Sequence, residues 1–509
     1  MKRRTLLKAA AAASWLPVLG STASATATGS ATRPGTLFYE GFDEVSNPAS
    51  FTHRLPEGWT SSLEGVTSGE KRWEGWTLTT IRDWTWACGT KKRHWFTRGY
   101  RQVCVVDSKQ QRLNSTDRMN AHLFSPAIDV TGHRAITVEF DSHYRQGRKG
   151  QSAEVTAHLG DQEITLLRLT EDRFSSHEAL HLEIPTGVST LRLGFHYLGG
   201  NDDWFWAIDN VAVTTPLPEV TGPPIAIIDV LSDIQGAITD YEDAVRQLNA
   251  MPEPAHALVI NGDAVDNGST ELWEEFAAAT ARTPHASGKT IMTAGNHEMY
   301  GDEGSHAYIE RFLHYSRCQE LWREVIINGI PIITLNSEYY SDVDRDGKEP
   351  FVRLSPDQLA WLDERLLRWQ QHGVTVLLFA HYLLPGTVSM SHSAWYQNDY
   401  EDLEALSNVL SKYSHHIMFT SHSHSSLLHQ HDWWGIRRYP GTGEAGAIGF
   451  PVVNTGAILN AYMPEGDHDE VILDEPAASG LRVHVYDDRV RVEAWDFVER
   501  KQVKGWDFR

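Results

Sequence analysis

The pattern of apolar and polar positions divides the chain into two regions of different character. Between residues 36 and 215, apolar and polar residues alternate in short runs such as AITVEFDSHY, AEVTAHLG and TLRLGFHY, separated by Gly, Asn, Asp and Pro. A period of two predicts half-buried strands, and many short strands at this spacing predict an antiparallel β-sandwich. We therefore expect residues 36–215 to form an all-β domain.

From residue 225 to residue 509 the pattern is that of an α/β domain. Continuous apolar runs such as IAIIDVL, ALVIN and VTVLLF alternate with segments of helical periodicity such as TELWEEFAAATAR and SPDQLAWLDERLLRWQQHG. Such apolar runs predict buried strands, and the helices between them predict βαβ units. LRVHVYDDRVRVEAWDFV predicts a terminal hairpin that turns at Asp487 and Asp488. The Pro-rich segment 216–224 is the expected linker between the two domains.

Five of the predicted strands end on side chains that bind metals. These are Asp233, then Asp263 with Asp266, then Asn296 with His297, then His381, and finally His422 with His424. A right-handed βαβ path brings the carboxyl ends of parallel strands to one edge of a sheet. Carboxylate, amide and imidazole ligands at one edge are what divalent metal ions need. The sequence therefore predicts a metal site at this edge.

The motifs SDIQG, GDAVD, GNHE, AHY and SHSH, in this order, resemble those of the calcineurin-like metallophosphoesterases. The resemblance extends from about Pro224 to the C-terminus and implies a four-layer α/β fold, a β-sandwich flanked by helices. It also implies a role for each motif residue. Asp233 and His424 would bind the first metal, Asp263 would bridge both, Asn296, His381 and His422 would bind the second, and His297, oriented by Asp266, would stabilise charge or protonate the leaving oxygen.

The activity implied is that of a dinuclear metal-dependent phosphoesterase that hydrolyses phosphomonoesters or phosphodiesters through a metal-bridging hydroxide. Gln235 stands where the family usually has a metal-binding histidine. Its carbonyl oxygen is a harder ligand than imidazole, so among Mn, Fe and Zn we expect Mn to be favoured for the two divalent ions. Asp266 replaces the metal-binding Tyr of purple acid phosphatases and disfavours an Fe(III) centre. The alternative is a surface or glycan-binding protein with a weakly active or vestigial phosphoesterase domain.

The N-terminal domain resembles MAM-like jelly-roll domains of secreted enzymes in LFYEGFDE, LFSPAIDV and DDWFWAIDNVAV. The resemblance implies contact with glycans or cell surfaces, sometimes with a structural Ca²⁺; a domain that only shields the catalytic domain is the alternative. Tryptophans are frequent in its first part, and we expect them to fill the sandwich rather than to stack on sugars. They are Trp59, Trp73, Trp76, Trp84, Trp86 and Trp95.

Residues 1–27 resemble a twin-arginine export signal, with Arg3 and Arg4 ahead of an apolar stretch and small-residue cleavage sites. The apolar stretch is shorter than the ~20 residues that span a bilayer, so we expect no stable membrane span, although an uncleaved anchor is the alternative. Residues 28–35 form a predicted linker. The expected location is secreted, periplasmic or in the cell envelope.

Composition adds limits on partners and on bonding. The net charge of −22 argues against nucleic acid as the main partner. In an exported protein Cys88 and Cys104 can form a disulfide, which leaves Cys318 as a buried thiol in the helix predicted from SHAYIERFLHYSRCQELW.

The segment SDVDRDGKEPFV contains the opening of an EF-hand-like loop. Asp342, Asp344, Asp346 and Gly347 match that opening, but Arg353 occupies the twelfth position, where Ca²⁺ binding needs Glu. We therefore expect an acidic turn rather than a Ca²⁺ site.

Overall fold

The structure is a computed structural model that describes residues 35–43, 51–148, 150–346, 348, 350–439 and 449–509. The predicted export signal of residues 1–27, most of the linker 28–35 and Gly347 of the EF-hand-like segment lie outside the described residues. The described residues belong to a single unit, so the domain boundary at 216–224 stays a prediction.

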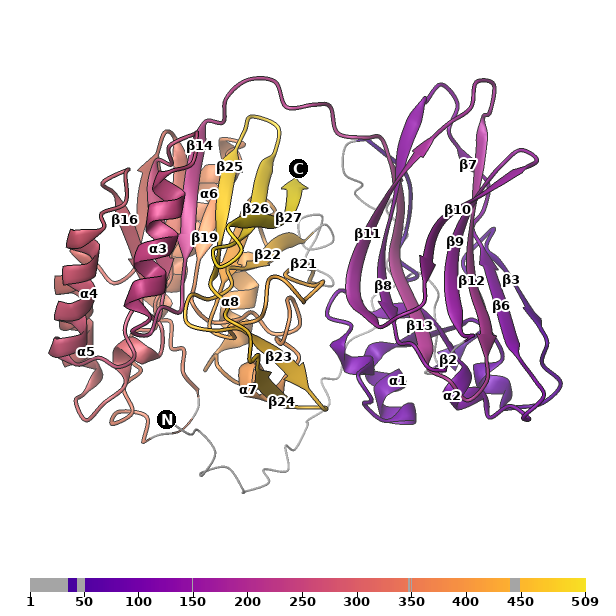
Figure 1. Ribbon diagram of the computed structural model, residues 1–509, viewed down its shortest axis with the longest axis horizontal. Coiled ribbons are helices and arrows are strands. Elements are labelled where there is room, and N and C mark those ends of the chain that lie inside the picture. The colour runs from indigo at the N-terminus through magenta and orange to yellow at the C-terminus, as the bar shows by residue number, and fades with distance from the viewer. Residues whose placement is uncertain (1–34, 44–50, 149, 347, 349, 440–448) are drawn as a thin grey trace. The chain divides into compact units, whose positions relative to one another are not determined.

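The region from residue 35 to residue 215 consists of two antiparallel sheets (Figure 1). The 7-stranded sheet contains β1 (Thr36–Glu40), β2 (Phe51–Thr52), β4 (Thr77–Thr80), β5 (Gln102–Asp107), β8 (Ala135–Tyr144), β11 (Arg173–Glu183) and β13 (Phe205–Thr214). The 6-stranded sheet contains β3 (Thr60–Glu64), β6 (Met119–Phe124), β7 (Ile128–Asp129), β9 (Ser152–Leu159), β10 (Gln162–Leu169) and β12 (Thr190–Gly200). Two short helices, α1 (Ile81–Cys88) and α2 (Ser108–Gln111), accompany them.

One hydrophobic core joins the facing sides of these sheets, as the alternating pattern predicted. On β12, for example, Leu191, Leu193 and Phe195 are buried in this core, and the residues between them point to the other face. Five of the six tryptophans named above are buried, whereas Trp86 on α1 is 90% exposed.

The disulfide that Cys88 and Cys104 could form is not present, because both cysteines are free. Cys104 belongs to the core between the two sheets, whereas Cys88 packs against a separate cluster around Trp84 and Phe205. The two thiols therefore face different environments.

The region from residue 225 to residue 509 contains two further six-stranded sheets. The first has the order β16 (Thr290–Thr293), β15 (Ala257–Asn261), β14 (Ala226–Leu231), β25 (Ser479–Val485), β26 (Val490–Asp496) and β27 (Lys501–Phe508). The second has the order β17 (Arg323–Ile327), β18 (Ile330–Thr334), β19 (Val376–Phe379), β20 (His416–Thr420), β22 (Phe450–Asn454) and β21 (Trp434–Arg437). Strands β14, β15 and β16 are parallel, as are β18, β19, β20 and β22. The hairpin predicted at Asp487 and Asp488 is the antiparallel pair β25–β26.

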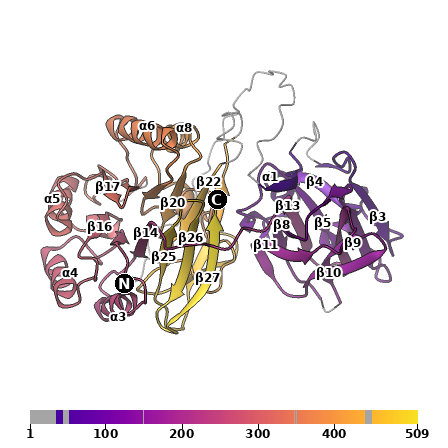
Figure 2. The same ribbon diagram turned by 90° about the horizontal axis from the view of Figure 1, so that it is seen from above.

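The two sheets share an apolar core, and helices cover their outer faces. Helices α3 (Ile238–Asn249), α4 (Thr270–Arg282) and α5 (Ser305–Ser316) lie on one side, and α6 (Pro356–Gln371) and α8 (Leu403–Leu410) lie on the other (Figure 2). The short elements α7 (Ala394–Gln397), β23 (Tyr462–Glu465) and β24 (Asp469–Ile472) complete the region. The predicted fold class, a four-layer α/β fold with an N-terminal all-β region, is confirmed.

Three smaller points complete the comparison with the sequence. Cys318 is buried but lies beyond α5, which ends at Ser316 before the left-handed Arg317. In the acidic segment, Asp342 pairs with Arg345 and Asp346 pairs with Lys348. In the part of the chain that the structure describes, no helix has the length and apolar character needed to cross a membrane.

Candidate metal centre

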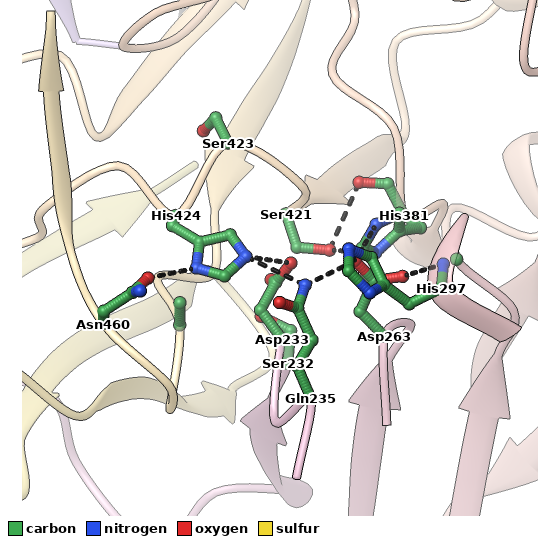
Figure 3. A network of polar contacts seen from close by, with 12 residues as sticks. Ser232, Asp233, Gln235, Asp263, His297, His381, Ser421, Ser423, His424 and Asn460 are labelled. Atoms are coloured by element: carbon green, nitrogen blue, oxygen red, sulfur yellow. Dashed lines mark hydrogen bonds and ion pairs between the residues drawn. The ribbon is translucent and has the colours of Figure 1, made fainter. Parts of the chain in front are cut away.

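The candidate metal centre lies where parallel strands of both sheets end. Asp233 follows β14, Asp263 follows β15 and Asn296 follows β16, while His381 follows β19. His422 and His424 follow β20. Figure 3 shows side chains from both sheets converging, with Asp233, Gln235 and His424 to one side and Asp263, His297 and His381 to the other.

Five of the seven predicted ligands have a left-handed backbone. The φ angles are 50° at Asp233, 45° at Gln235, 53° at Asp263, 66° at His422 and 50° at His424. A non-glycine residue in this conformation costs of order 1–3 kcal/mol, and such strain is concentrated at functional sites. The sharp turns direct successive side chains toward the same edge.

Glycine is needed immediately before Asn296, another of the predicted ligands. A Cβ atom at Gly295 would collide with Oδ1 of Asp263. The same carboxylate oxygen accepts a hydrogen bond from the backbone N–H of His297, 2.9 Å away. The glycine of the GNHE motif therefore lets this loop close against Asp263.

The first ligand group consists of Asp233, Asp263 and His424, whose ligand atoms lie within 4.8 Å of one another. Nε2 of His424 is 3.2 Å from Oδ1 of Asp233. Nδ1 of His424 lies 2.7 Å from Oδ1 of Asn460, to which it can donate its proton. That hydrogen bond would fix the ring so that the lone pair of Nε2 points into the group.

Gln235 lies against this first group through its amide nitrogen. Nε2 of Gln235 donates to Oδ2 of Asp263 at 2.8 Å and lies 3.1 Å from Nε2 of His424. Rotation of the amide by half a turn would present its oxygen to the same place. Gln235 is therefore positioned to contribute the hard oxygen ligand predicted from the sequence.

The second ligand group consists of Asp263, His381 and His422, again with ligand atoms within 4.8 Å of one another. Nε2 of His381 lies 3.3 Å from Oδ2 of Asp263 and 3.2 Å from Oδ1 of Asn296. Nδ1 of His381 is 2.8 Å from the backbone carbonyl of Asn261 and can donate to it, which leaves Nε2 as the ligand atom. Because Asp263 belongs to both groups, it can bridge two ions.

The site contains buried carboxylates whose negative charge bound cations would balance. Burial alone would raise the pKa of Asp263, but the neighbouring His381 and His297 outweigh it and hold that pKa well below its usual range. Burial and the charge of Asp263 raise the pKa of Glu298 to about 7. Both carboxylate oxygens of Asp233 are buried and receive no hydrogen bond from the described residues. Buried carboxylates without donors are stabilised by metal ions, so the donor set fits a pair of divalent cations.

His297 lies beside Asp263, with its Nε2 3.9 Å from Oδ2 of that residue. Its Nδ1 is 2.7 Å from the backbone carbonyl of Asp266 and 3.5 Å from Oδ1 of the Asp266 carboxylate. The Asp266 side chain is 62% exposed. The predicted contact between the two residues is present, but the close hydrogen bond is to the carbonyl oxygen rather than to the carboxylate.

The structure adds residues that the sequence did not assign. The buried carboxylate of Glu298 accepts hydrogen bonds from the backbone N–H groups of Asp263 at 3.0 Å, Ala264 at 2.6 Å and Gly295 at 2.5 Å. Nε2 of His422 lies 3.6 Å from Oδ2 of the buried Asp399. Glu298 is the last residue of the GNHE motif, so the sequence could have indicated that it belongs to the site. No sequence pattern marks Asn460 or Asp399.

Solved structures with similarity to the chain include two phosphatases. A dimetal phosphatase from Danio rerio is 15% identical, with 56% of this chain and 99% of that chain covered and a TM-score of 0.39. A purple acid phosphatase from yellow lupin (Lupinus luteus) seeds is 11% identical, with 88% and 90% covered and a TM-score of 0.39. An adhesin domain of Lys-gingipain from Porphyromonas gingivalis is 15% identical, with 35% and 98% covered and a TM-score of 0.23.

No curated protein matches the chain. The family model described as calcineurin-like phosphoesterase matches residues 227–426, a range that contains all the predicted ligands. The C-terminal region of this chain therefore carries a calcineurin-like phosphoesterase domain.

Proposed function

We propose that the protein is an exported, dinuclear metal-dependent phosphoesterase that hydrolyses phosphomonoesters or phosphodiesters. The observation that carries this proposal is the pair of ligand groups that share Asp263. A carboxylate common to two sites holds two cations a few ångströms apart, which is the arrangement of two-metal hydrolases. Of Mn, Fe and Zn, we favour Mn because Gln235 supplies an amide oxygen where imidazole would suit zinc.

Some residues of the site would bind the metal ions, and others would position the ligands or transfer a proton. When bound, two divalent ions polarise phosphoryl oxygens and lower the pKa of water between them. His424 and His381 present Nε2 to the two groups because Asn460 and Asn261 hold their Nδ1 atoms. Glu298 fixes the loop that carries Asp263.

His297 is placed to serve the leaving group. The carbonyl oxygen and the carboxylate of Asp266 beside Nδ1 are acceptors for a proton on that nitrogen, and they orient the ring. Its Nε2 then faces the Asp263 side of the site and can give a proton to the departing oxygen. Asp266 would act on His297 as a positioning residue, mainly through its backbone carbonyl.

The metal content of an Asp263 variant tests the proposal. Asp263→Ala, loaded with Mn²⁺, should retain neither ion of the pair, because each group loses a shared ligand. Asp266→Ala is the matched control: it removes a neighbouring but exposed carboxylate and should keep both ions. Full Mn²⁺ content in Asp263→Ala would refute the bridging assignment.

Export by the twin-arginine route is part of the proposal and rests on Arg3 and Arg4 ahead of the short apolar stretch. Replacement of both arginines by lysine should keep the protein in the cytoplasm. Export of that variant at the wild-type level would contradict the proposed route.

Glycan contact by the N-terminal domain is a second candidate function, supported by Trp86. This tryptophan is 90% exposed on α1, and an exposed aromatic ring can stack on a sugar ring. Retention on immobilised polysaccharide should fall in Trp86→Ala but not in Tyr339→Ala, which removes another exposed aromatic ring. Equal retention of both variants would remove the support for this function.

A further inference from the structure

A cluster of histidines lies on the outer face of the six-stranded sheet of the N-terminal sandwich. Its members are His122 on β6, His158 on β9 and His196 on β12, together with Glu163 on the edge strand β10. The strands are neighbours in the order β10-β9-β12-β6 (Figure 1). Because core residues alternate with these positions, all four side chains point away from the apolar interior.

The register of the sheet brings these side chains together. His196 pairs directly with His122, and Glu163 pairs directly with His158. Thr156 on β9 pairs with Gly194 on β12, between the two histidine positions. Directly opposed residues have Cβ atoms about 4.5–5.5 Å apart, so pairs on adjoining strands form one continuous group.

Gly194 opens the space in which His196 and His158 approach each other. A Cβ atom at Gly194 would lie 2.5 Å from both Nε2 of His196 and Oγ1 of Thr156. With no side chain there, the hydroxyl of Thr156 lies 2.8 Å from Nε2 of His196 and 3.2 Å from Nε2 of His158. Ligand atoms of His158, Glu163 and His196 all lie within 4.8 Å of one another.

His122 holds His196 in the orientation that a ligand needs. The Nδ1 atoms of the two rings are 2.8 Å apart, so one donates a hydrogen bond to the other. If Nδ1–H of His196 donates, its Nε2 keeps a lone pair directed at His158 and Glu163.

We propose that this face of the sandwich binds one divalent ion of the zinc type through His158, Glu163 and His196, with His122 orienting His196. Two imidazoles and one carboxylate are a ligand set that suits zinc. Because zinc usually has four ligands, a fourth position would remain for water or for a side chain of a partner protein. The site differs in chemistry from the oxygen-rich dinuclear centre, so it should prefer zinc where that centre prefers manganese.

A zinc ion here would fasten the edge of the sheet. Glu163 lies on β10, which pairs only with β9 in the order of this sheet, whereas His196 lies on β12, one strand further in. An ion held by both residues would link β10 to β12 across β9. Ligands from three strands would therefore hold the edge strand in register, in addition to its ladder hydrogen bonds.

Zinc counting on the full chain tests this site. Chelator-treated protein is supplied with zinc chloride, and bound zinc is counted by native mass spectrometry. Glu163→Gln and His158→Gln should each hold one zinc ion fewer than the wild type, with phosphoesterase activity unchanged. Glu163 is 59% exposed at its side chain, so its substitution leaves the core intact.

The chain offers a matched control in His181, which pairs with Glu183 at 2.8 Å on the exposed face of β11 and belongs to none of the ligand groups found among the described residues. His181→Gln should bind as much zinc as the wild type. His122→Phe should keep the ion but weaken its affinity about 10–100-fold in competition with a chromophoric chelator, the usual effect of losing an orienting partner. Equal zinc content in Glu163→Gln, His158→Gln and the wild type would overturn the proposal.

Discussion

Acid should destabilise the region that carries the phosphoesterase domain through one buried histidine. His416 begins β20, the strand that leads to His422 and His424. Its ring is buried, neither ring nitrogen has a hydrogen-bond partner among the described residues, and Phe450 packs on it with ring centroids 4.1 Å apart. Burial, with a smaller effect of His415, lowers the pKa of His416 from 6.5 to about 3.

The sign and size of the effect follow from this shift. Between about pH 3 and pH 6.5 the unfolded chain binds a proton at His416 that the folded chain does not, so stability falls as the pH drops through this window. Above pH 6.5 the contribution is constant. At pH 5, about 1.5 units below the pKa of His416 in the unfolded chain, protonation stabilises the unfolded state by roughly 2 kcal/mol.

Urea unfolding at pH 8 and pH 5 measures this term. We expect His416→Leu to lose about 2 kcal/mol less stability than the wild type between the two pH values, because Leu cannot take up the proton. His181→Leu, which changes an exposed histidine, is the control and should follow the wild type. Equal losses in His416→Leu and the wild type would refute the assignment of this pH dependence to His416.

Three further predictions concern the metal centre. His297→Ala should lower the rate about 10²–10⁴-fold while keeping both metals, as measured by kcat and metal content; an unchanged kcat would exclude a proton-transfer role. Gln235→His should shift preference from Mn²⁺ toward Zn²⁺ in metal competition, because imidazole replaces an amide oxygen; an unchanged preference would show that Gln235 is no ligand. Glu298→Gln should weaken metal retention, since loss of a carboxylate oxygen leaves the N–H groups of Asp263 and Gly295 short of an acceptor at a cost of about 1–3 kcal/mol each. Wild-type metal affinity in Glu298→Gln would contradict that role.

Much of the centre was predictable because its residues follow strand ends. Asp233, Asp263 and Asn296 each come shortly after a buried apolar run, and parallel strands bring such positions to one edge. Local sequence thus determined both the strand and the place of its ligand. The residues that orient the ligands were not predictable in this way.

Asn460 and Asp399 illustrate the limit. Asn460 meets His424 across 36 residues of chain, and the loops that carry it and Asp399 have no periodic pattern. The same holds for the histidine cluster of the sandwich, since alternation predicts that His122 and His196 face outward but not that β6 and β12 are neighbours. The absent Cys88–Cys104 disulfide has a similar cause, because two neighbouring cores separate the thiols.

The most direct test of the account is restoration of activity by metal. The mature protein is stripped of metal, resupplied with Mn²⁺, Fe²⁺ or Zn²⁺, and assayed on p-nitrophenyl phosphate and on its bis ester. The account predicts turnover of at least one of these esters that depends on added metal, with Mn²⁺ the most effective ion. A folded protein that binds two metals at Asp263 and turns over neither ester with any ion would contradict it.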